Sequence, residues 1–328
     1  MKRLLNLINT NSGKTSNTMN YNNRTKFLEL EKDVDAEDST TTWNNILSVH
    51  SIYGKCDQAK KTTVHDGSVP KPSNHVRFVC ISDTHGKHRK INLPDGDVLL
   101  HAGDITNVGE PNQLEDFAEW LSKLNYKQKV VIAGNHDLTI DKPYFKNKEN
   151  YSHIVRNPKI LSLSDDDDQM ADTKHEMISD RARKALCENT HFTYLEDDSV
   201  TVLGGYKIYG SPWQPEFYNW AFNLRRGEEC SKMWEKIPLD TDILITHGPP
   251  IGHGDKCKSG HNAGCVDLLA RVVDHVKPLF HVFGHIHEGY GATTNGTTTF
   301  VNASTCTLSY KPDHSPLVFD LPIRNSHA

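Results

Sequence analysis

The sequence predicts an α/β protein in which two sheets face each other and helices cover them, and three observations lead to this fold class. Five short apolar runs rich in Val, Ile and Leu recur between residues 77 and 283. Helical patterns with one apolar face lie between them. The chain has 328 residues, which is enough to bury a core that supports itself without disulfides.

The five apolar runs are typical of strands that are covered on both faces, because they lack the polar alternation of a half-exposed strand. They are RFVCIS (77–82), DVLLHA (97–102), KVVIA (129–133), DILIT (242–246) and LFHVF (279–283). Further strands are expected in TVLGGYKIYGS (201–211), TTTFVNAS (297–304) and PLVFDL (316–321). Strands of this kind form the inner layers of a layered α/β fold.

Two segments are expected to form helices on the outside of the sheets. In residues 111–124, apolar side chains recur at helical spacing, and Pro111 stands where a first-turn proline is welcome. Residues 265–276 show a similar apolar face. We therefore expect one catalytic domain over residues 75–321, preceded by a polar and mostly disordered extension (1–74) and followed by a short tail (322–328).

Composition excludes several classes of protein. The formal net charge is -5 and no basic stripe is visible, so neither a nucleic-acid polymer nor a membrane surface is an expected partner. No apolar run reaches membrane-spanning length, and the opening MKRLLNLINT lacks the apolar region of a secretory signal. Seven scattered cysteines without a CxxC pair suit a reducing compartment. A cytoplasmic protein is expected, and the sequence does not predict its oligomeric state.

Potential metal ligands follow each of the five apolar runs within about five residues. They are Asp83, His85, Asp104, Asn135, His136, His247, His285 and His287. Because ligands bind outside the carboxyl ends of strands in open α/β sheets, these side chains are expected to meet at one edge. Oxygen and imidazole donors without thiolate suit two divalent ions, with Mn expected and Fe or Zn as alternatives.

The motifs DTH, GD, GNHD, THG and GHIH, in this order between residues 83 and 287, resemble the calcineurin-like metallophosphoesterase superfamily. SPWQPEFYNWAFN (211–223) and HVFGHIHEGYG (281–291) are similar to its metallophosphoesterase-domain-containing branch, which is likened to class III cyclic nucleotide phosphodiesterases. The resemblance implies a β-sandwich flanked by helices. It also implies an enzyme, a metal-dependent phosphoric diester hydrolase.

The resemblance further implies roles for individual residues. Asp83, His85, Asp104 and His287 would hold one metal ion, and Asp104, Asn135, His247 and His285 the other. Asp104 would bridge the ions, and a bridging hydroxide would attack phosphorus opposite the leaving group. His136 would act as the general acid. The role of Asp137 stays open between orienting His136 and capping a turn.

We expect small phosphodiesters as substrates, with cyclic nucleotides as candidates. The residues expected to contact the substrate are Asn135, His136, Trp213 and His253. A phosphomonoesterase is the enzymatic alternative, and a metal- and nucleotide-binding scaffold with low activity is the alternative of another class. Trp213 belongs to an aromatic cluster that also contains Phe217, Tyr218, Trp220 and Phe222, for which core packing and stacking on a nucleobase both remain open.

Two further segments imitate metal sites. His253, Cys257, His261 and Cys265 recur at four-residue spacing, but the glycines among them oppose a helix, so a mobile loop near the substrate is expected instead of a zinc site. DDDDQMADTKHE (165–176) has acidic residues at EF-hand spacing, but Met170 stands where that loop requires glycine. This segment is expected to be a solvated acidic loop.

Overall fold

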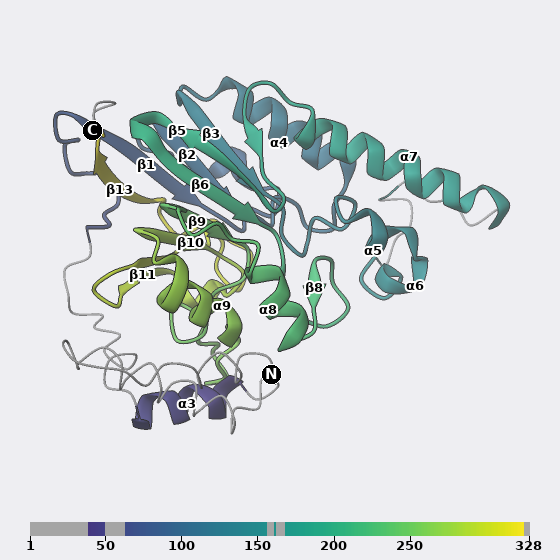
Figure 1. Ribbon diagram of the computed structural model, residues 1–328. Coiled ribbons are helices and arrows are strands. Elements are labelled where there is room, and N and C mark those ends of the chain that lie inside the picture. The colour runs from purple at the N-terminus through teal and green to yellow at the C-terminus, as the bar shows by residue number, and fades with distance from the viewer. Residues whose placement is uncertain (1–38, 50–62, 156–160, 162–167, 325–328) are drawn as a thin grey trace.

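Two sheets lie face to face in the computed structural model, which describes residues 39–49, 63–155, 161 and 168–324 (Figure 1). Within these residues, one sheet has the strand order β13 (Leu317–Pro322), β1 (His75–Ile81), β2 (Val98–Ala102), β3 (Gln128–Ile132), β4 (Thr193–Tyr194). The other has the order β11 (Gly291–Thr294), β12 (Thr299–Asn302), β10 (Phe280–Phe283), β9 (Ile243–Thr246), β6 (Tyr206–Ser211), β5 (Asp198–Val202). A small pair joins β7 (Gln214–Pro215) to β8 (Asn223–Leu224).

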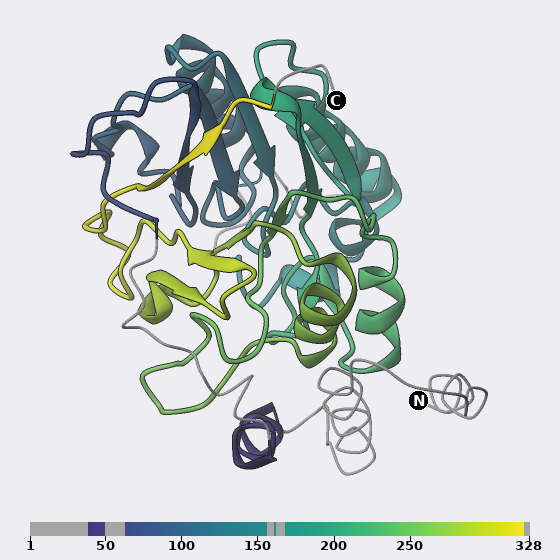
Figure 2. The same cartoon turned by 60° about the vertical axis from the view of Figure 1, so that its left-hand side comes forward.

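Helices cover the outer faces of both sheets (Figures 1 and 2). Those described are α3 (Ser39–Val49), α4 (Pro111–Lys123), α5 (Lys142–Lys146), α6 (Lys148–Tyr151), α7 (Asp168–Cys187), α8 (Glu228–Trp234) and α9 (Val266–Ala270). Short helical turns are η1 (His88–Lys90), η3 (Leu203–Gly205), the π-helical η4 (Arg271–Val276) and η5 (His287–Gly289). None of the described helices combines the length and apolar character that crossing a membrane requires.

The strands are apolar throughout because each sheet is buried on both faces. In β1, Val79 and Ile81 pack with Leu114 and Phe117 of α4, whereas the alternate residues Phe78 and Cys80 belong to the cluster between the sheets. On the far side of the second sheet, Leu244 and Phe283 pack with residues of α8 and α9, including Trp234 and Leu268. The order of layers is therefore helix, sheet, sheet, helix.

The strand directions decide where the polar residues gather. β1, β2 and β3 run parallel to one another, and so do β6, β9 and β10. A bridge between Ser82 and Ser304 joins the two sheets just beyond the ends of β1 and β12, where the amide of Thr305 donates to Ser82 O at 2.8 Å. The carboxyl ends of both sheets therefore meet at one edge of the sandwich.

The predicted fold class is confirmed, and each predicted apolar run overlaps a strand. Residues 201–211, expected as one strand, instead contain the end of β5 and all of β6, because Gly204 (φ 78°) and Gly205 (φ 76°) turn the chain between them. The predicted acidic loop (165–176) was wrong for residues 168–176, which open α7, and residues 165–167 lie outside the described residues. Further along that helix, Ile178, Ala182 and Leu186 pack into the same core cluster as α4. This packing stabilises a helix whose first turns have a polar sequence.

Part of the predicted polar extension packs against the domain. Trp43 of α3 is 7% exposed and belongs to the cluster that contains Ile251 and Val266, and Ser39 Oγ donates to Asn262 O. His65 and Val318 exchange backbone hydrogen bonds of 2.8 and 2.7 Å. Residues 1–38 and 50–62 of the extension, and 325–328 of the tail, lie outside the described residues.

The packing between the sheets allows a prediction of how much stability is lost when one aromatic ring is removed. Phe319 is fully buried between Phe78, with ring centroids 5.0 Å apart, and Phe280, 3.6 Å away. Phe319→Ala should lower the free energy of unfolding by about 3–5 kcal/mol, because it leaves a cavity between two sheets that cannot collapse onto it. Phe319→Leu, the matched control, should cost clearly less in the same urea titration. Equal stability of wild type and Phe319→Ala would contradict this packing.

Candidate metal centre

Polar side chains lie just beyond the carboxyl ends of the central strands of both sheets. Asp83 follows β1, Asp104 follows β2, and Asn135 follows β3; His247 and His285 follow β9 and β10. Four of the predicted ligands adopt positive φ angles that are uncommon outside glycine: Asp83 (52°), His85 (43°), Asp104 (55°) and His285 (67°). Such backbone conformations cluster at functional sites, because the surrounding fold must hold them in place.

The side chains form two groups that meet at Asp104. In the first, His287 Nε2 lies 3.3 Å from Asp83 Oδ1 and 3.3 Å from His85 Nε2. In the second, which also contains His285, His247 Nε2 lies 3.3 Å from Asp104 Oδ1. The other oxygen of Asp104, Oδ2, lies 3.8 Å from His85 Nε2. Within each group, the potential ligand atoms are all within 4.8 Å of one another.

Backbone carbonyls fix the orientation of four histidines. The ring Nδ1 atoms donate to these carbonyl oxygens: His85 to Thr106 (3.1 Å), His136 to Asn107 (2.7 Å), His247 to Ala102 (2.9 Å) and His287 to Thr307 (3.1 Å). A proton on Nδ1 leaves the lone pair of Nε2 free in the neutral ring, and this pattern is usual for metal-binding histidines. In each case Nε2 is the atom that lies near Asp83 or Asp104.

The centre contains more acceptors than donors. With Nδ1 protonated, His247 Nε2 faces another acceptor, Asn135 Oδ1, at 2.9 Å, and the lone pairs of His85 Nε2 and His287 Nε2 face each other at 3.3 Å. The amide Nδ2 of Asn135 is buried and has no partner among the described residues. Converging lone pairs repel unless a cation or an additional proton lies between them. The residues therefore fit divalent metal ions.

Buried charges at the centre support one another. Burial opposes ionisation of Asp83, but the hydrogen bond and charge of His287 outweigh it and hold the pKa of Asp83 well below its usual range. Burial likewise opposes ionisation of Asp104, whose pKa is lowered by His247 and His136. Burial would lower the pKa of His247, but Asp104 raises it to about 9. Both carboxylates are therefore ionised, and at neutral pH His247 balances part of this charge as an imidazolium, with a proton that a divalent cation would displace.

Asp137 is a structural residue of this edge. It is fully buried, and its carboxylate accepts hydrogen bonds from the backbone amides of Gly134 (2.9 Å), Ile105 (3.2 Å) and Thr106 (2.9 Å). Burial and the charge of Asp104 raise the pKa of Asp137 to about 6. The ring of His136 is fixed by the Asn107 carbonyl instead. Asp137 therefore joins the loops after β2 and β3, and it does not orient His136.

Three aromatic rings border the histidines. Trp220 packs on His136 with centroids 4.0 Å apart, Phe217 meets the edge of His285 at 5.0 Å, and Tyr310 meets His85 at 4.7 Å. Trp220 and Phe217 belong to the aromatic cluster noted in the sequence, but nothing there showed which rings face the site. Tyr310 was missed, because it lies in a loop with no motif around it.

A model of the family described as Calcineurin-like phosphoesterase matches residues 76–289. The chain belongs to this family. It is therefore a metal-dependent phosphoesterase, and the two ligand groups match the binuclear divalent centre that the family uses. The sequence resemblance to the superfamily is confirmed.

Calcineurin-like phosphoesterase relatives cover most of the chain. Metallophosphoesterase domain-containing protein 1 of Homo sapiens is 47% identical over 266 residues, which span 80% of this chain and 76% of the relative. A UPF0046 protein of Caenorhabditis elegans is 43% identical over 290 residues, 88% of this chain and 68% of the relative. The crystal structure of TT1561 of Thermus thermophilus superposes with a TM-score of 0.42 at 12% identity, over 76% of this chain and 99% of that one.

Two residues that the sequence assigned to substrate contact have other contacts in this phosphoesterase. Trp213 donates from Nε1 to Asp197 Oδ2 at 3.1 Å and packs edge-on against Phe222. His253 is 2% exposed and stacks on Phe300 with centroids 3.7 Å apart. In the structure Trp213 is thus engaged by Asp197 and Phe222, and His253 is buried against Phe300 of the second sheet; contact of either residue with substrate stays a prediction.

The loop predicted to be mobile is tied by its backbone. Ile251 and Cys265 are joined by a hydrogen bond of 3.1 Å, and the amide of Ala263 donates to Asp255 O at 3.0 Å. His261 contacts Thr40 of α3 at 3.0 Å, while Cys265 accepts from Trp234 Nε1 at 3.3 Å. The four His and Cys residues of this segment therefore do not converge on one ion.

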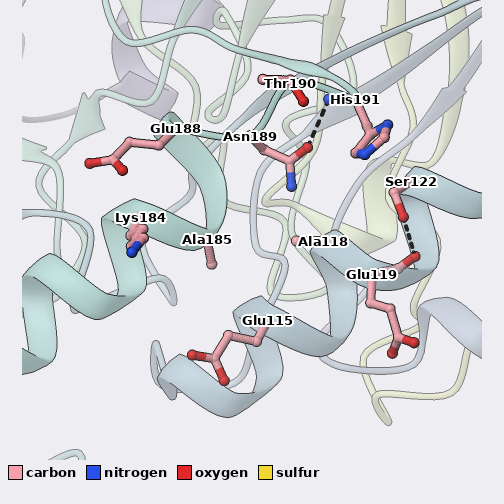
Figure 3. A pocket seen from close by; sticks show the side chains of 10 residues that line it. All are labelled: Glu115, Ala118, Glu119, Ser122, Lys184, Ala185, Glu188, Asn189, Thr190 and His191. Carbon is pink, nitrogen blue, oxygen red and sulfur yellow. Dashed lines mark hydrogen bonds between the residues drawn. The ribbon is translucent and has the colours of Figure 1, made fainter.

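A surface hollow of about 410 Å³ lies between α4 and α7 of the phosphoesterase (Figure 3). Glu115, Glu119 and Ser122 line it from α4, and Lys184 and Ala185 from α7. It shares no residue with the two ligand groups. The chemistry of this phosphoesterase is therefore to be sought at the sheet edge.

The close approach at Gly134 predicts a loss of metal. A Cβ atom at this position would lie 2.3 Å from Asp104 Oδ1 and 2.7 Å from His247 Cε1, so Gly134→Ala must displace the shared carboxylate. We expect bound Mn to fall about tenfold or more at equal free Mn, measured by elemental analysis after dialysis. Gly205→Ala is the control for a strained substitution away from the site, since its φ of 76° disfavours alanine while its Cβ would meet only Arg324, at 3.9 Å. Full metal content in Gly134→Ala would contradict the geometry.

Burial of His253 predicts a pH dependence of stability. Burial lowers its pKa to about 3, so between pH 6.5 and 3 the unfolded chain binds one more proton at this residue than the folded chain. His253 therefore costs stability as the pH falls through that window, by up to about 1.4 kcal/mol per pH unit. In His253→Phe, the slope of unfolding free energy against pH between 6 and 5 should decrease by about 1 kcal/mol per unit. An unchanged slope would contradict the burial of a neutral ring.

Proposed function

We propose that this phosphoesterase is a phosphodiesterase that hydrolyses small phosphodiesters, with cyclic nucleotides as candidate substrates. One observation supports the proposal most strongly: the two oxygens of the buried Asp104 carboxylate face different ligand groups, Oδ1 towards His247 and Oδ2 towards His85. A carboxylate in this position can be shared by two ions. Two closely spaced cations are suited to in-line displacement at phosphorus.

The residues that would hold the ions follow from the two groups. Asp83, His85, Asp104 and His287 would hold one ion; Asp104, Asn135, His247 and His285 would hold the other. We propose Mn, with Fe or Zn as alternatives, because the donors are carboxylate, amide and imidazole without thiolate. When bound, the ions would neutralise charge on the phosphoryl group and activate a water nucleophile.

His136 would give a proton to the leaving oxygen, and its surroundings support this role. Its Nδ1 is engaged by Asn107 O, and its Nε2 lies 3.9 Å from Asp104 Oδ2, at the junction of the two groups. Trp220 packs on one side of the ring, while the side chain stays 12% exposed and therefore within reach of a substrate. Proton donation by a positioned imidazole typically contributes about 10²–10⁴ in rate.

Asn135 would bind the phosphoryl group as well as a metal ion. Its Oδ1 faces His247, and its Nδ2 is a buried donor without a partner among the described residues. A buried amide N–H without an acceptor is costly, so a phosphoryl oxygen at this position would be stabilised.

The assay compares leaving groups as well as variants. Mn-loaded protein should hydrolyse an aryl phosphodiester faster than the matching monoester, and Asp104→Asn should lose activity by about 100-fold or more because both ligand groups lose charge. His136→Asn should lose far more activity on a 2′,3′-cyclic nucleotide than on a nitrophenyl diester, since only an alkoxide leaving group needs its proton.

His191→Asn provides the control, because His191 is exposed in the hollow between α4 and α7, away from the site. If the wild-type protein hydrolysed the diester no faster than Asp104→Asn, the enzymatic proposal would be contradicted. A monoester preference would instead support the phosphomonoesterase alternative.

A further inference from the structure

Tyr310 lies over the first ligand group without being one of its ligands. Its ring centroid is 4.7 Å from that of His85, 5.7 Å from that of His287 and 6.2 Å from that of His136. The residue is 42% exposed. It therefore stands between solvent and the point where one ligand group meets the proposed general acid.

The same carbonyl positions Tyr310 and a ligand. Thr307 O accepts from His287 Nδ1 at 3.1 Å and from the backbone amide of Tyr310 at 2.8 Å. The loop is attached further back, where Thr305 donates to Ser82 O at 2.8 Å, one residue before Asp83. The position of the tyrosine is thus linked to both ends of the first ligand group.

The backbone of Tyr310 is unusual for a bulky residue. Its φ angle is 55°, in the left-handed region that a residue with a large side chain rarely adopts. A strained conformation persists only where the surrounding structure holds it, and such positions cluster at binding and catalytic sites. The turn in which the amide of Tyr310 donates to Thr307 O holds this conformation beside the first ligand group.

The hydroxyl of Tyr310 is an available donor. Within the part of the chain that the structure describes, it makes no hydrogen bond, whereas Tyr290 of the neighbouring segment donates to Ser315 O at 2.8 Å. A phenol hydroxyl can donate one hydrogen bond, so Tyr310 can offer a neutral donor to a ligand beside His85.

We propose that Tyr310 is a substrate-positioning residue whose hydroxyl donates a hydrogen bond to a phosphoryl oxygen bound at the metal centre. This inference rests on the proposed phosphoester site. It adds a neutral donor to a site whose other side chains are metal ligands and the general acid. The ring would also shield the phosphoryl group from solvent on the side of His85.

The test measures binding of inorganic phosphate to the Mn-loaded full chain by calorimetry. Tyr310→Phe removes only the hydroxyl, so phosphate should bind about tenfold more weakly, as expected for a lost hydrogen bond to a charged group. Bound Mn, measured by elemental analysis, should stay at the wild-type level. Tyr310→Ala should weaken phosphate binding at least as much. Tyr290→Phe is the matched control and should bind phosphate like the wild type.

The outcomes separate this inference from the enzymatic proposal. Equal phosphate affinity in wild type and Tyr310→Phe, or no phosphate binding by the wild type, would overturn the role of Tyr310. Loss of Mn from Tyr310→Phe would also overturn it, because the tyrosine would then support His287 and not the phosphate. Weaker phosphate binding in Tyr310→Phe, together with a failure to hydrolyse any diester, would remove the proposed function and leave this inference standing.

Discussion

The Asp104 carboxylate is the interaction on which the site depends, because it lies where the two ligand groups meet. It is 2% exposed and surrounded by imidazoles on both sides. A buried carboxylate is costly unless it is paired, and here its pairing requires His247 from the second sheet as well as His85 from the first. The site therefore exists only when the two sheets pack with their carboxyl ends at one edge.

The backbone around the site lets the ligand side chains approach one another closely. A Cβ atom on Gly284 would lie 2.0 Å from Asp83 Oδ2, and one on Gly103 would lie 2.6 Å from His247 Nδ1. Side chains at these positions would fill the space that the carboxylate and imidazole occupy. Backbone carbonyls at strand ends and in loops accept the Nδ1 protons of the imidazoles. The fold itself therefore points the Nε2 lone pairs into the site. Packing, backbone strain and acceptor excess all support the same centre.

Much of the fold and of the ligand set could be predicted, because both depend on rules that act along the chain. Continuous apolar runs identify strands buried on both faces, and parallel strands bring the residues at their carboxyl ends together. The choice between Trp213 and Trp220 could not be made in this way. Both lie in an irregular segment without a periodicity that fixes direction, and only tertiary contacts turn one towards Asp197 and the other towards His136. Tyr310 was not predicted because it also lies in an irregular segment. The helix α7 was not predicted because its apolar packing residues come only after a polar first part.

The central claim is that two ions share one carboxylate, and the most direct measurement is electron paramagnetic resonance of the Mn-loaded protein together with metal stoichiometry. Two Mn ions that share the Asp104 carboxylate would lie close enough to couple magnetically. Two Mn per chain with an exchange-coupled spectrum, which reverts to uncoupled signals in Asp104→Asn, is the predicted result. A single Mn per chain with the spectrum of an isolated ion would contradict the account.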